Sequence, residues 1–321
     1  MKIGMVTDSL SHLSLDEMLD FAAQQEIDCI ELNAGNWGTT THLGEPAELI
    51  ESKQRRRELL AKIKDRGLSI SALNANGNQL HPVSGPQHAQ RIEETIELAA
   101  LLDVERVVMM SGLPAGGPQD RTPNWVVSSW PTETQQILDY QWNEIAIPYW
   151  RRLDECAASH GVQQLCIEAH GNQLVYNAPT FLRLRDAIGP RIGLNLDPSH
   201  LIWMGGDPIA IVEQCADYIY HVHAKDAALD SRNVALNTRL DHQPMAHQTS
   251  RAWSYLTLGY GQDEPWWRRF GYALQTAGLG DRVLSIEHED MQLSRCEGVR
   301  RSVELLRRCI PREAADYQLP E

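Results

Sequence analysis

Four short segments in the second half of the chain read Leu165-Cys-Ile-Glu168-Ala-His170, Gly193-Leu-Asn-Leu-Asp197-Pro-Ser-His200, Ile219-Tyr-His-Val-His223-Ala-Lys225-Asp226 and Val283-Leu-Ser-Ile-Glu287-His-Glu289. Each segment is rich in strand-forming apolar residues and ends in one side chain that can bind a metal ion: Glu168, Asp197, His223 or Glu287. Side chains of a strand alternate between two faces. The four segments can therefore be tested for a shared register.

The four registers agree. With the metal-binding residue pointing inward, the other inward residues are Cys166 and His170, Asn195 and Ser199, His221 and Lys225, and Ser285 and Glu289. The opposite face then carries Leu165 and Ile167, Leu194 and Leu196, Tyr220 and Val222, and Leu284 and Ile286. An apolar outer face is typical of strands that helices cover. The agreement predicts a metal site where four strands converge.

Eight strand candidates alternate with helical patterns along the whole chain, which is the signature of repeated βα units. The first four strands are expected at 2–7, 29–33, 69–74 and 106–110, and helices are expected from Ser14, over 46–66, over 87–102 and over 132–160 with an interruption at Pro148. The last four helices should begin near Pro179, Asp207, Pro265 and Glu297. Ser14-x-x-Glu17 is a capping box, and Gly67 should end the second helix.

This alternation favours a single (β/α)₈ barrel over 1–310, with a C-terminal tail at 311–321, rather than an open doubly wound sheet. No G-x-G-x-x-G follows the first strand and no phosphate-binding G-x-x-x-x-G-K-[ST] occurs. Long loops are expected at 112–131 and 226–264, after the fourth and seventh strands. Loops in those places belong to the face of a barrel on which active sites are built.

Composition narrows the possible partners. The formal net charge of -14 argues against nucleic acid and anionic membranes, which need clustered Lys and Arg. The six cysteines are scattered without a C-x-x-C pair, as in reduced intracellular proteins. There is no leader-like N-terminus and no apolar run long enough to span a bilayer. We expect a soluble cytoplasmic protein.

Two Glu, one Asp and one His provide three oxygen ligands and one nitrogen ligand. This set suits Mn²⁺ best, with Mg²⁺ or Co²⁺ as alternatives, and leaves Fe²⁺ and Zn²⁺ open. The alternative is a group of buried carboxylates held by Lys and Arg. Four such residues at adjacent strand ends would be a costly cluster of negative charge without a cation.

The chain resembles the xylose-isomerase-like barrel superfamily, the sugar phosphate isomerase/epimerase group that also includes endonuclease IV. The resemblance covers nearly the whole chain and rests on the Glu of strand five, Asp-x-x-His after strand six, His-x-His-x-Lys-Asp on strand seven and the Glu of strand eight. It implies that Glu168, Asp197, His223 and Glu287 bind the metal and that His200 contacts the substrate. In ketose 3-epimerases of this group the two metal-bound glutamates exchange the substrate proton, a role that passes to Glu168 and Glu287.

The resemblance and the site chemistry together favour a metal-dependent isomerase or epimerase. A cation bridging a carbonyl and a hydroxyl stabilises the enediolate formed when the α-proton leaves, and a base on each side of that carbon permits isomerisation or epimerisation. The alternative is a 3-keto-glycoside lyase or C-glycoside deglycosidase, in which the same enolate expels an aglycone. The long Trp-bearing insertions resemble those of such enzymes.

Further residues are candidates for contact with a carbohydrate. His170 and Lys225 are possible acid/base groups, with ion pairing of Lys225 to Asp226 or Glu289 as an equal alternative. Glu31, Asn74 and His81 end strands two and three and are candidate hydroxyl contacts, although structural hydrogen bonding is the commoner role. The chain has nine Trp and three Phe. Trp37 and Trp125 follow strands, where an indole can stack on a sugar ring.

Two other functions remain as contrasts. An endonuclease IV-like phosphodiesterase needs histidines where this chain has Asn74 and Asn76 after strand three and Met109, Met110 and Ser111 after strand four. A non-catalytic binding protein would have no reason to keep four metal ligands. The expected partner is a small carbohydrate, with a second protomer or a small subunit as a possible protein partner.

Overall fold

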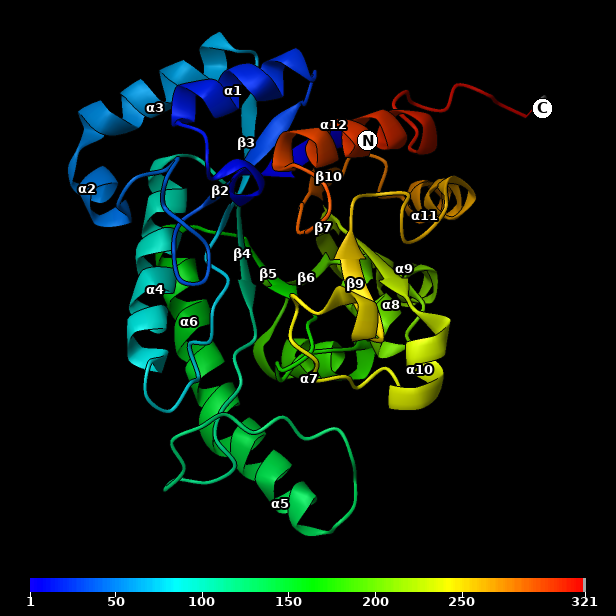
Figure 1. Ribbon diagram of the computed structural model, residues 1–321. Helices are drawn as coiled ribbons and strands as arrows, with labels where there is room; N and C mark the ends of the chain where they lie inside the picture. Colours follow the sequence, from blue (N-terminus) through cyan, green and yellow to red (C-terminus); the bar gives the residue numbers. More distant parts are fainter. Residues whose placement is uncertain (320–321) are drawn as a thin grey trace.

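Eight parallel strands close into a barrel in the computed structural model, which describes residues 1–319 (Figure 1). The barrel follows the order β1-β10-β7-β6-β5-β4-β3-β2. The strands are β1 Lys2–Val6, β2 Cys29–Asn33, β3 Ser69–Asn74, β4 Arg106–Met110, β5 Gln164–Glu168, β6 Ile192–Leu196, β7 Ile219–Ala224 and β10 Val283–Ile286. The predicted (β/α)₈ barrel is confirmed.

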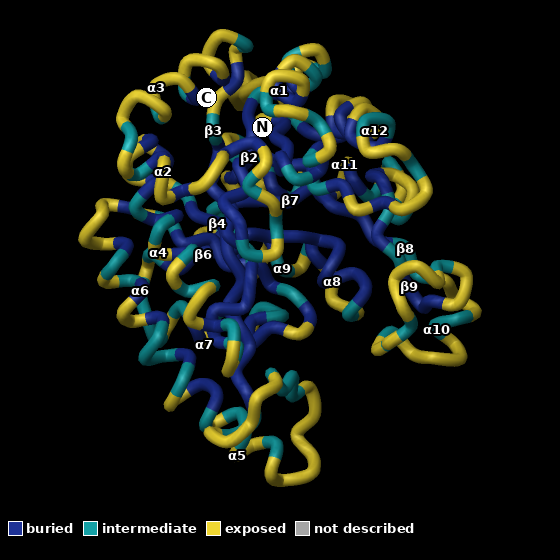
Figure 2. Tube along the Cα trace, turned by 60° about the vertical axis from the view of Figure 1, so that its left-hand side comes forward, coloured by how far each residue is buried: buried dark blue, intermediate teal, exposed yellow. Residues whose placement is uncertain are grey.

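Helices surround the strands, which form the buried interior of the molecule (Figure 2). Their bounds are α1 Leu15–Gln24, α2 Pro46–Glu51, α3 Lys53–Asp65, α4 Gly85–Leu101, α5 Glu133–Asp139, α6 Ile147–His160, α7 Ala178–Ile188, α8 Pro198–Met204, α9 Pro208–Cys215, α10 Ser231–Asn237, α11 Glu264–Thr276 and α12 Arg295–Cys309. The main core lies between the outer faces of the strands and these helices, and it includes Leu165, Ile167, Val222 and Ile286. Burying such side chains contributes about 1.5–3 kcal/mol each.

Local signals set most helix ends. Ser14 and Glu17 form the predicted capping box at the start of α1. The single helix expected over 46–66 is wrong, because the chain turns extended at Ser52 and restarts as α3, with the Ser52 hydroxyl accepting from the N–H of Arg55. The helix expected over 132–160 is not interrupted at Pro148: α5, a π-helical segment at Tyr140–Ala146 and α6 follow one another directly, and Pro148 comes just after the change to α geometry.

One residue of the predicted register is wrong. Leu194 pairs with Ile219 but Asn195 pairs with His221, so β7 contains a bulge at Tyr220. The Tyr220 ring packs at the bottom of the barrel interior with Val108 and Cys166 instead of facing the helices. A Cβ on Gly193 would lie only 1.9 Å from this ring, so the glycine provides the space that the bulge requires.

The long loop predicted after β7 contains secondary structure. It contains β8 Asp226–Leu229, α10 and β9 Trp253–Leu256, and the two strands pair antiparallel in a separate sheet. The buried carboxylate of Asp226 anchors the insertion by accepting from the backbone N–H groups of Gly259, Gly261 and Gln262. The segment after β4 is irregular apart from one bridge between Ala115 and Pro123.

Two further expectations concern the cysteines and membranes. All six cysteines are free thiols. Within residues 1–319, no helix has both the length and the apolar character needed to cross a membrane.

Candidate metal centre

The carboxyl ends of β5, β6, β7 and β10 bring Glu168, Asp197, His223 and Glu287 together. One ligand atom from each of the four lies within 4.8 Å of the other three. Nδ1 of His223 is 3.2 Å from Oε2 of Glu168 and 3.1 Å from Oε2 of Glu287. The four side chains chosen from the sequence therefore form one cluster.

Two polar atoms of this cluster fit a bound cation. Nδ1 of His223 and Oδ2 of Asp197 are buried and form no contact of hydrogen-bond geometry within the described residues, although Nε2 of His200 lies 3.2 Å from Oδ2. Nδ1 of His223 and Oδ2 of Asp197 lie 4.0 Å apart. A buried polar atom without a partner is costly, and a dication shared by an imidazole nitrogen and carboxylate oxygens would satisfy both atoms.

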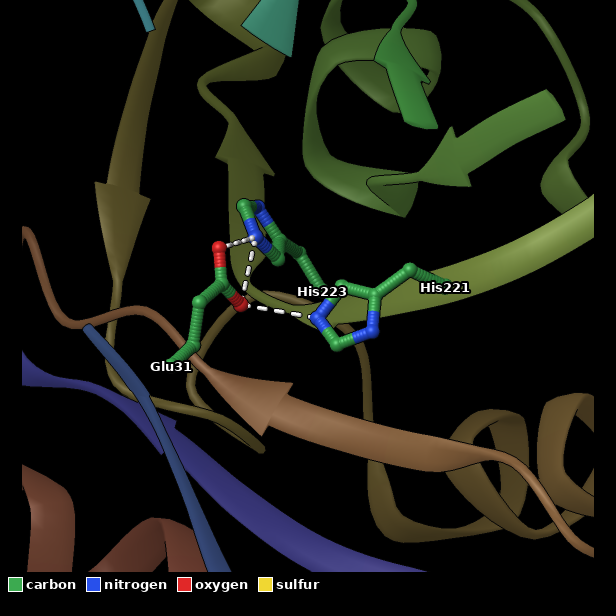
Figure 3. A group of neighbouring side chains, drawn as sticks. All are labelled: Glu31, His221 and His223. Carbon is green, nitrogen blue, oxygen red and sulfur yellow. Dashed lines mark hydrogen bonds and ion pairs between the residues drawn. The ribbon is translucent and has the colours of Figure 1, made fainter. Parts of the chain in front are cut away.

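Glu31 fixes the orientation of the histidine ligand (Figure 3). Nε2 of His223 lies 3.0 Å and 3.2 Å from the two oxygens of Glu31, and Nε2 of His221 lies 2.7 Å from Oε2. Burial opposes ionisation here, but the imidazoles of His223 and His221 hold the pKa of the Glu31 carboxyl well below its usual value. A carboxylate on the far ring nitrogen leaves Nδ1 free to bind a metal.

Asn74 belongs to the same support. Its side-chain amide donates to Oε1 of Glu31 over 2.7 Å. The structure thus places Glu31 and Asn74, both expected to contact substrate hydroxyls, behind His223. Their polar side-chain atoms form hydrogen bonds or ion pairs with other residues of the protein.

Glu168 is held by amides and by a histidine. Asn76 and Asn195 donate to its Oε2 over 3.0 Å and 3.1 Å, and Nε2 of His200 lies 3.0 Å from Oε1. Burial opposes ionisation of Glu168, but His223 and His200 hold its pKa well below the usual value. The carboxylate is therefore ionised and fixed in place.

His200 contacts two members of the cluster, Glu168 and Asp197. Its Nε2 is also 3.2 Å from Oδ2 of Asp197. Burial lowers the basicity of the ring, but Asp197 and Glu168 outweigh burial and raise the pKa of His200 to about 9. The ring of His170 lies 3.9 Å from that of His200, and burial together with this neighbouring charge lowers the pKa of His170 to about 4.

Asp197 also starts a helix. Its Oδ1 accepts from the N–H of Ser199 over 2.8 Å and from the Ser199 hydroxyl over 2.7 Å, which caps α8. Pro198 occupies the first helical position, where proline is favoured. The Asp-Pro-Ser sequence thus fixes one carboxylate oxygen and leaves Oδ2 for the metal.

The chain belongs to a known family. A model of the family described as "Xylose isomerase-like TIM barrel" matches residues 19–309. This protein is a member of the xylose isomerase-like TIM barrel family. YfiH of Bacillus subtilis (strain 168) is 44% identical to it over 313 residues, which are 97% of this chain and 99% of YfiH.

Solved structures of low sequence identity share the fold. 3-Keto-D-glucoside 4-epimerase, YcjR, from E. coli in its apo form has a TM-score of 0.64 at 15% identity, over 96% of this chain and 100% of that chain. The IOLI protein with a zinc atom has a TM-score of 0.63 at 17% identity, over 97% of this chain and 98% of that chain. These likenesses show the fold of this family member and nothing about its substrate.

A lysine lies at the edge of the cluster in this xylose isomerase-like barrel. Nζ of Lys225 is 3.2 Å from Oε2 of Glu287 and 2.7 Å from Oε2 of Glu289. Burial opposes its charge, but Glu287 and Glu289 raise the pKa of Lys225 well above its usual value. Both sequence interpretations of Lys225 are compatible with this position, because the ion pair with Glu289 holds the ammonium beside a metal ligand.

Aromatic side chains from several connections pack next to His170 and His200. The indoles of Trp203 and Trp253 stack at 4.5 Å, and the ring of Trp253 lies 5.1 Å from that of Tyr255. A Cβ on Gly171 would lie 2.5 Å from Trp203 and 3.6 Å from Trp125, so these rings meet next to His170. Trp125 is therefore near the site.

The other two predicted contacts, Trp37 and His81, have partners of their own within the protein. Trp37 is 55% exposed, with its ring edge-on to His88 at 6.4 Å, and its backbone N–H donates to the carbonyl of Asn76. Nδ1 of His81 accepts from the N–H groups of Val83 and Ser84, just before α4. That nitrogen therefore accepts from backbone N–H groups next to a helix start, as the side chain of a helix cap does.

Tyr255 is the residue that sequence reasoning missed. It comes from β9, inside the insertion that the sequence defined only as a loop. The alternation Trp253-Ser254-Tyr255 is a strand pattern and was the available signal.

Proposed function

We propose that this protein is a divalent-metal-dependent isomerase or epimerase that removes a proton α to the carbonyl of a sugar or keto-sugar through an enediolate. The observation that carries the proposal is the cluster of Glu168, Asp197, His223 and Glu287 around two unpartnered buried atoms. When bound, the cation would stabilise negative charge developing on the substrate oxygens. Mn²⁺ is the proposed ion, because three of the four ligands are carboxylates.

Glu287 is the proposed base. Its side chain is 16% exposed, whereas those of Glu168, Asp197 and His223 are at most 1% exposed. Burial raises the pKa of Glu287 above its usual value, which makes the carboxylate a better proton acceptor at neutral pH. Glu168, fixed by two amides, is the second base of the pair.

Other residues have supporting roles in this scheme. Lys225 lies beside Glu287 and can polarise a substrate oxygen or return a proton. His200 is proposed to contact the substrate, with Glu168 and Asp197 stabilising its positive charge. The half-buried indole of Trp125 offers a flat apolar surface to a sugar ring or an aglycone, and the buried Trp203 and Trp253 pack behind it.

A second candidate is a 3-keto-glycoside lyase or C-glycoside deglycosidase. The half-buried Trp125 next to Gly171 favours it, because an indole beside His170 can stack on an aromatic aglycone. In that reaction the same α-proton leaves, and the electron pair of the enolate expels the aglycone from the β-carbon.

One experiment tests both candidates. The Mn²⁺-loaded protein is incubated with free ketoses and with a 3-keto-glycoside in D₂O. Deuterium at the α-carbon of recovered sugar supports the isomerase or epimerase, and release of free aglycone supports the lyase. If no substrate shows exchange and none releases an aglycone, the proposed chemistry is contradicted.

A further inference from the structure

A basic groove lies on the outside of the barrel, away from the metal centre. It has a volume of about 1030 Å³ and is bounded by α9, α11 and the end of α12. Its floor is formed by small or apolar side chains, among them Ala216, Ala273, Ala277 and Ile310. Tyr272 on its rim is 70% exposed.

The charge of this groove is opposite to that of the chain as a whole. Arg268, Arg269 and Arg308 line it, against one acidic residue, Glu213. Arg268 and Arg308 share Glu264 as an ion-pair partner, whereas Arg269 forms no ion pair with any residue of 1–319. A basic, partly apolar groove on a protein of formal net charge -14 fits an acidic partner that carries apolar side chains.

The segment after α12 has that chemistry. Residues 313–319 read Glu-Ala-Ala-Asp-Tyr-Gln-Leu, with Glu313 and Asp316 as the charged residues. Tyr317 is 81% exposed and Leu319 is 82% exposed. In an extended segment these two side chains share one face, because residues two apart do so. Figure 1 shows the segment leaving the end of α12 and extending away from the barrel.

The anchoring of the segment directs it away from the groove of its own chain. The guanidinium of Arg312 lies 2.8 Å and 3.1 Å from the two carboxylate oxygens of Asp28, which immediately precedes β2. The Met1 amino group donates to the carbonyl of Pro311 over 2.7 Å. Return to the groove at α11 would need a chain reversal immediately after Arg312, where residues 313–319 contain no Gly or Pro.

We propose that residues 313–319 bind the α9–α11 groove of a second copy of this chain, so that two copies exchange their C-terminal segments. Pro311 itself lines the groove, so a two-fold axis passing near Pro311 places the groove of the second copy within reach. Seven extended residues span roughly 23 Å. Each copy gives one segment and receives one, as a closed two-fold dimer requires. Tyr317 and Leu319 would cover the small side chains of the floor, and Asp316 would pair with Arg269.

The test is the molar mass of the full chain by sedimentation equilibrium at several protein concentrations. The wild type is expected to form a dimer. Arg269→Glu and Asp316→Arg should each raise the dimer dissociation constant at least ten-fold, and the double variant should return to within about three-fold of wild type, because it restores one opposite-charge pair in each groove. Arg300→Glu, an exposed charge reversal on α12 outside the groove, is the matched control and should leave the dissociation constant unchanged.

A second variant tests the apolar contact. Tyr317→Ser with Leu319→Ser removes both exposed apolar side chains and should give a monomer with unchanged circular dichroism and thermal midpoint. A wild type that is monomeric at every concentration would overturn the proposal, including the case in which the segment binds its own groove. A dimer whose dissociation constant is the same in all these variants would also overturn it, because another surface would then hold the copies together.

Discussion

The hydroxyl oxygen of Tyr255 lies 2.9 Å from Nδ1 of His200, so the insertion after β7 reaches the candidate metal centre through a hydrogen bond. Nζ of Lys225 lies 4.5 Å from the centre of the same tyrosine ring. The ring thus contacts two polar groups next to the metal ligands. Folding of the β8–β9 insertion and geometry of the metal centre are coupled through this residue.

Tyr255→Phe should destabilise the protein by about 1–3 kcal/mol, because it leaves Nδ1 of the buried His200 without its partner. The free energy of unfolding in urea measures this. Tyr260→Phe is the control, since its hydroxyl pairs with Arg301 at the surface and its loss should change stability by no more than about 0.5 kcal/mol. Equal stability of the two variants would show that the contact with His200 contributes nothing.

Glu31→Gln should weaken metal binding by about 10- to 100-fold without touching a ligand, because it removes the carboxylate that orients His223. Isothermal titration with Mn²⁺ gives the dissociation constant. Glu45→Gln, which alters an exposed pair with Arg91, should leave that constant at the wild-type value. An unchanged constant in Glu31→Gln would remove the assignment of Glu31 as a positioning residue.

Glu287→Gln should lower kcat for α-proton exchange by about 10²–10⁴-fold, the usual contribution of a general base. The amide oxygen still offers a ligand, so metal content by elemental analysis distinguishes loss of the base from loss of the ion. Glu297→Gln, an exposed change on α12, should retain wild-type exchange. Normal exchange in a metal-loaded Glu287→Gln protein would refute the role of Glu287 as base.

Metal binding should strengthen as pH rises. Burial opposes protonation of His223, but Glu31, Glu287 and Glu168 raise its pKa well above the usual value, and burial raises the pKa of Glu287. Without metal His223 therefore holds a proton that a cation must displace, and lowering the pH favours the protonated, metal-free form. We expect about one proton released per ion, from Nδ1 of His223. Calorimetry in buffers of different ionisation enthalpy counts the protons, and a count of zero would contradict this arrangement of His223.

The clustering of the four candidate metal ligands was predictable from sequence because each ends a strand whose alternation could be checked against three others. Parallel strands of a barrel bring their carboxyl ends to one face, so a shared register implies convergence. The face on which the Tyr220 side chain lies was not predictable in this way, since a bulge shifts the register of one strand without a local signal in its own sequence. Glu31 was identified as a candidate contact for substrate hydroxyls, but its role depends on which neighbour it meets.

The sequence by itself determined the (β/α)₈ order, the inward faces of the strands and the identity of the clustered ligands, because strand period and helix capping are local properties. Only the tertiary structure decided that Glu31 and Asn74 support His223 and that Tyr255 reaches His200. Those outcomes depend on contacts between residues far apart in the chain; Glu31 and His221, for example, are 190 positions apart. Closure of the barrel sets such distances, and no periodicity within one segment encodes them.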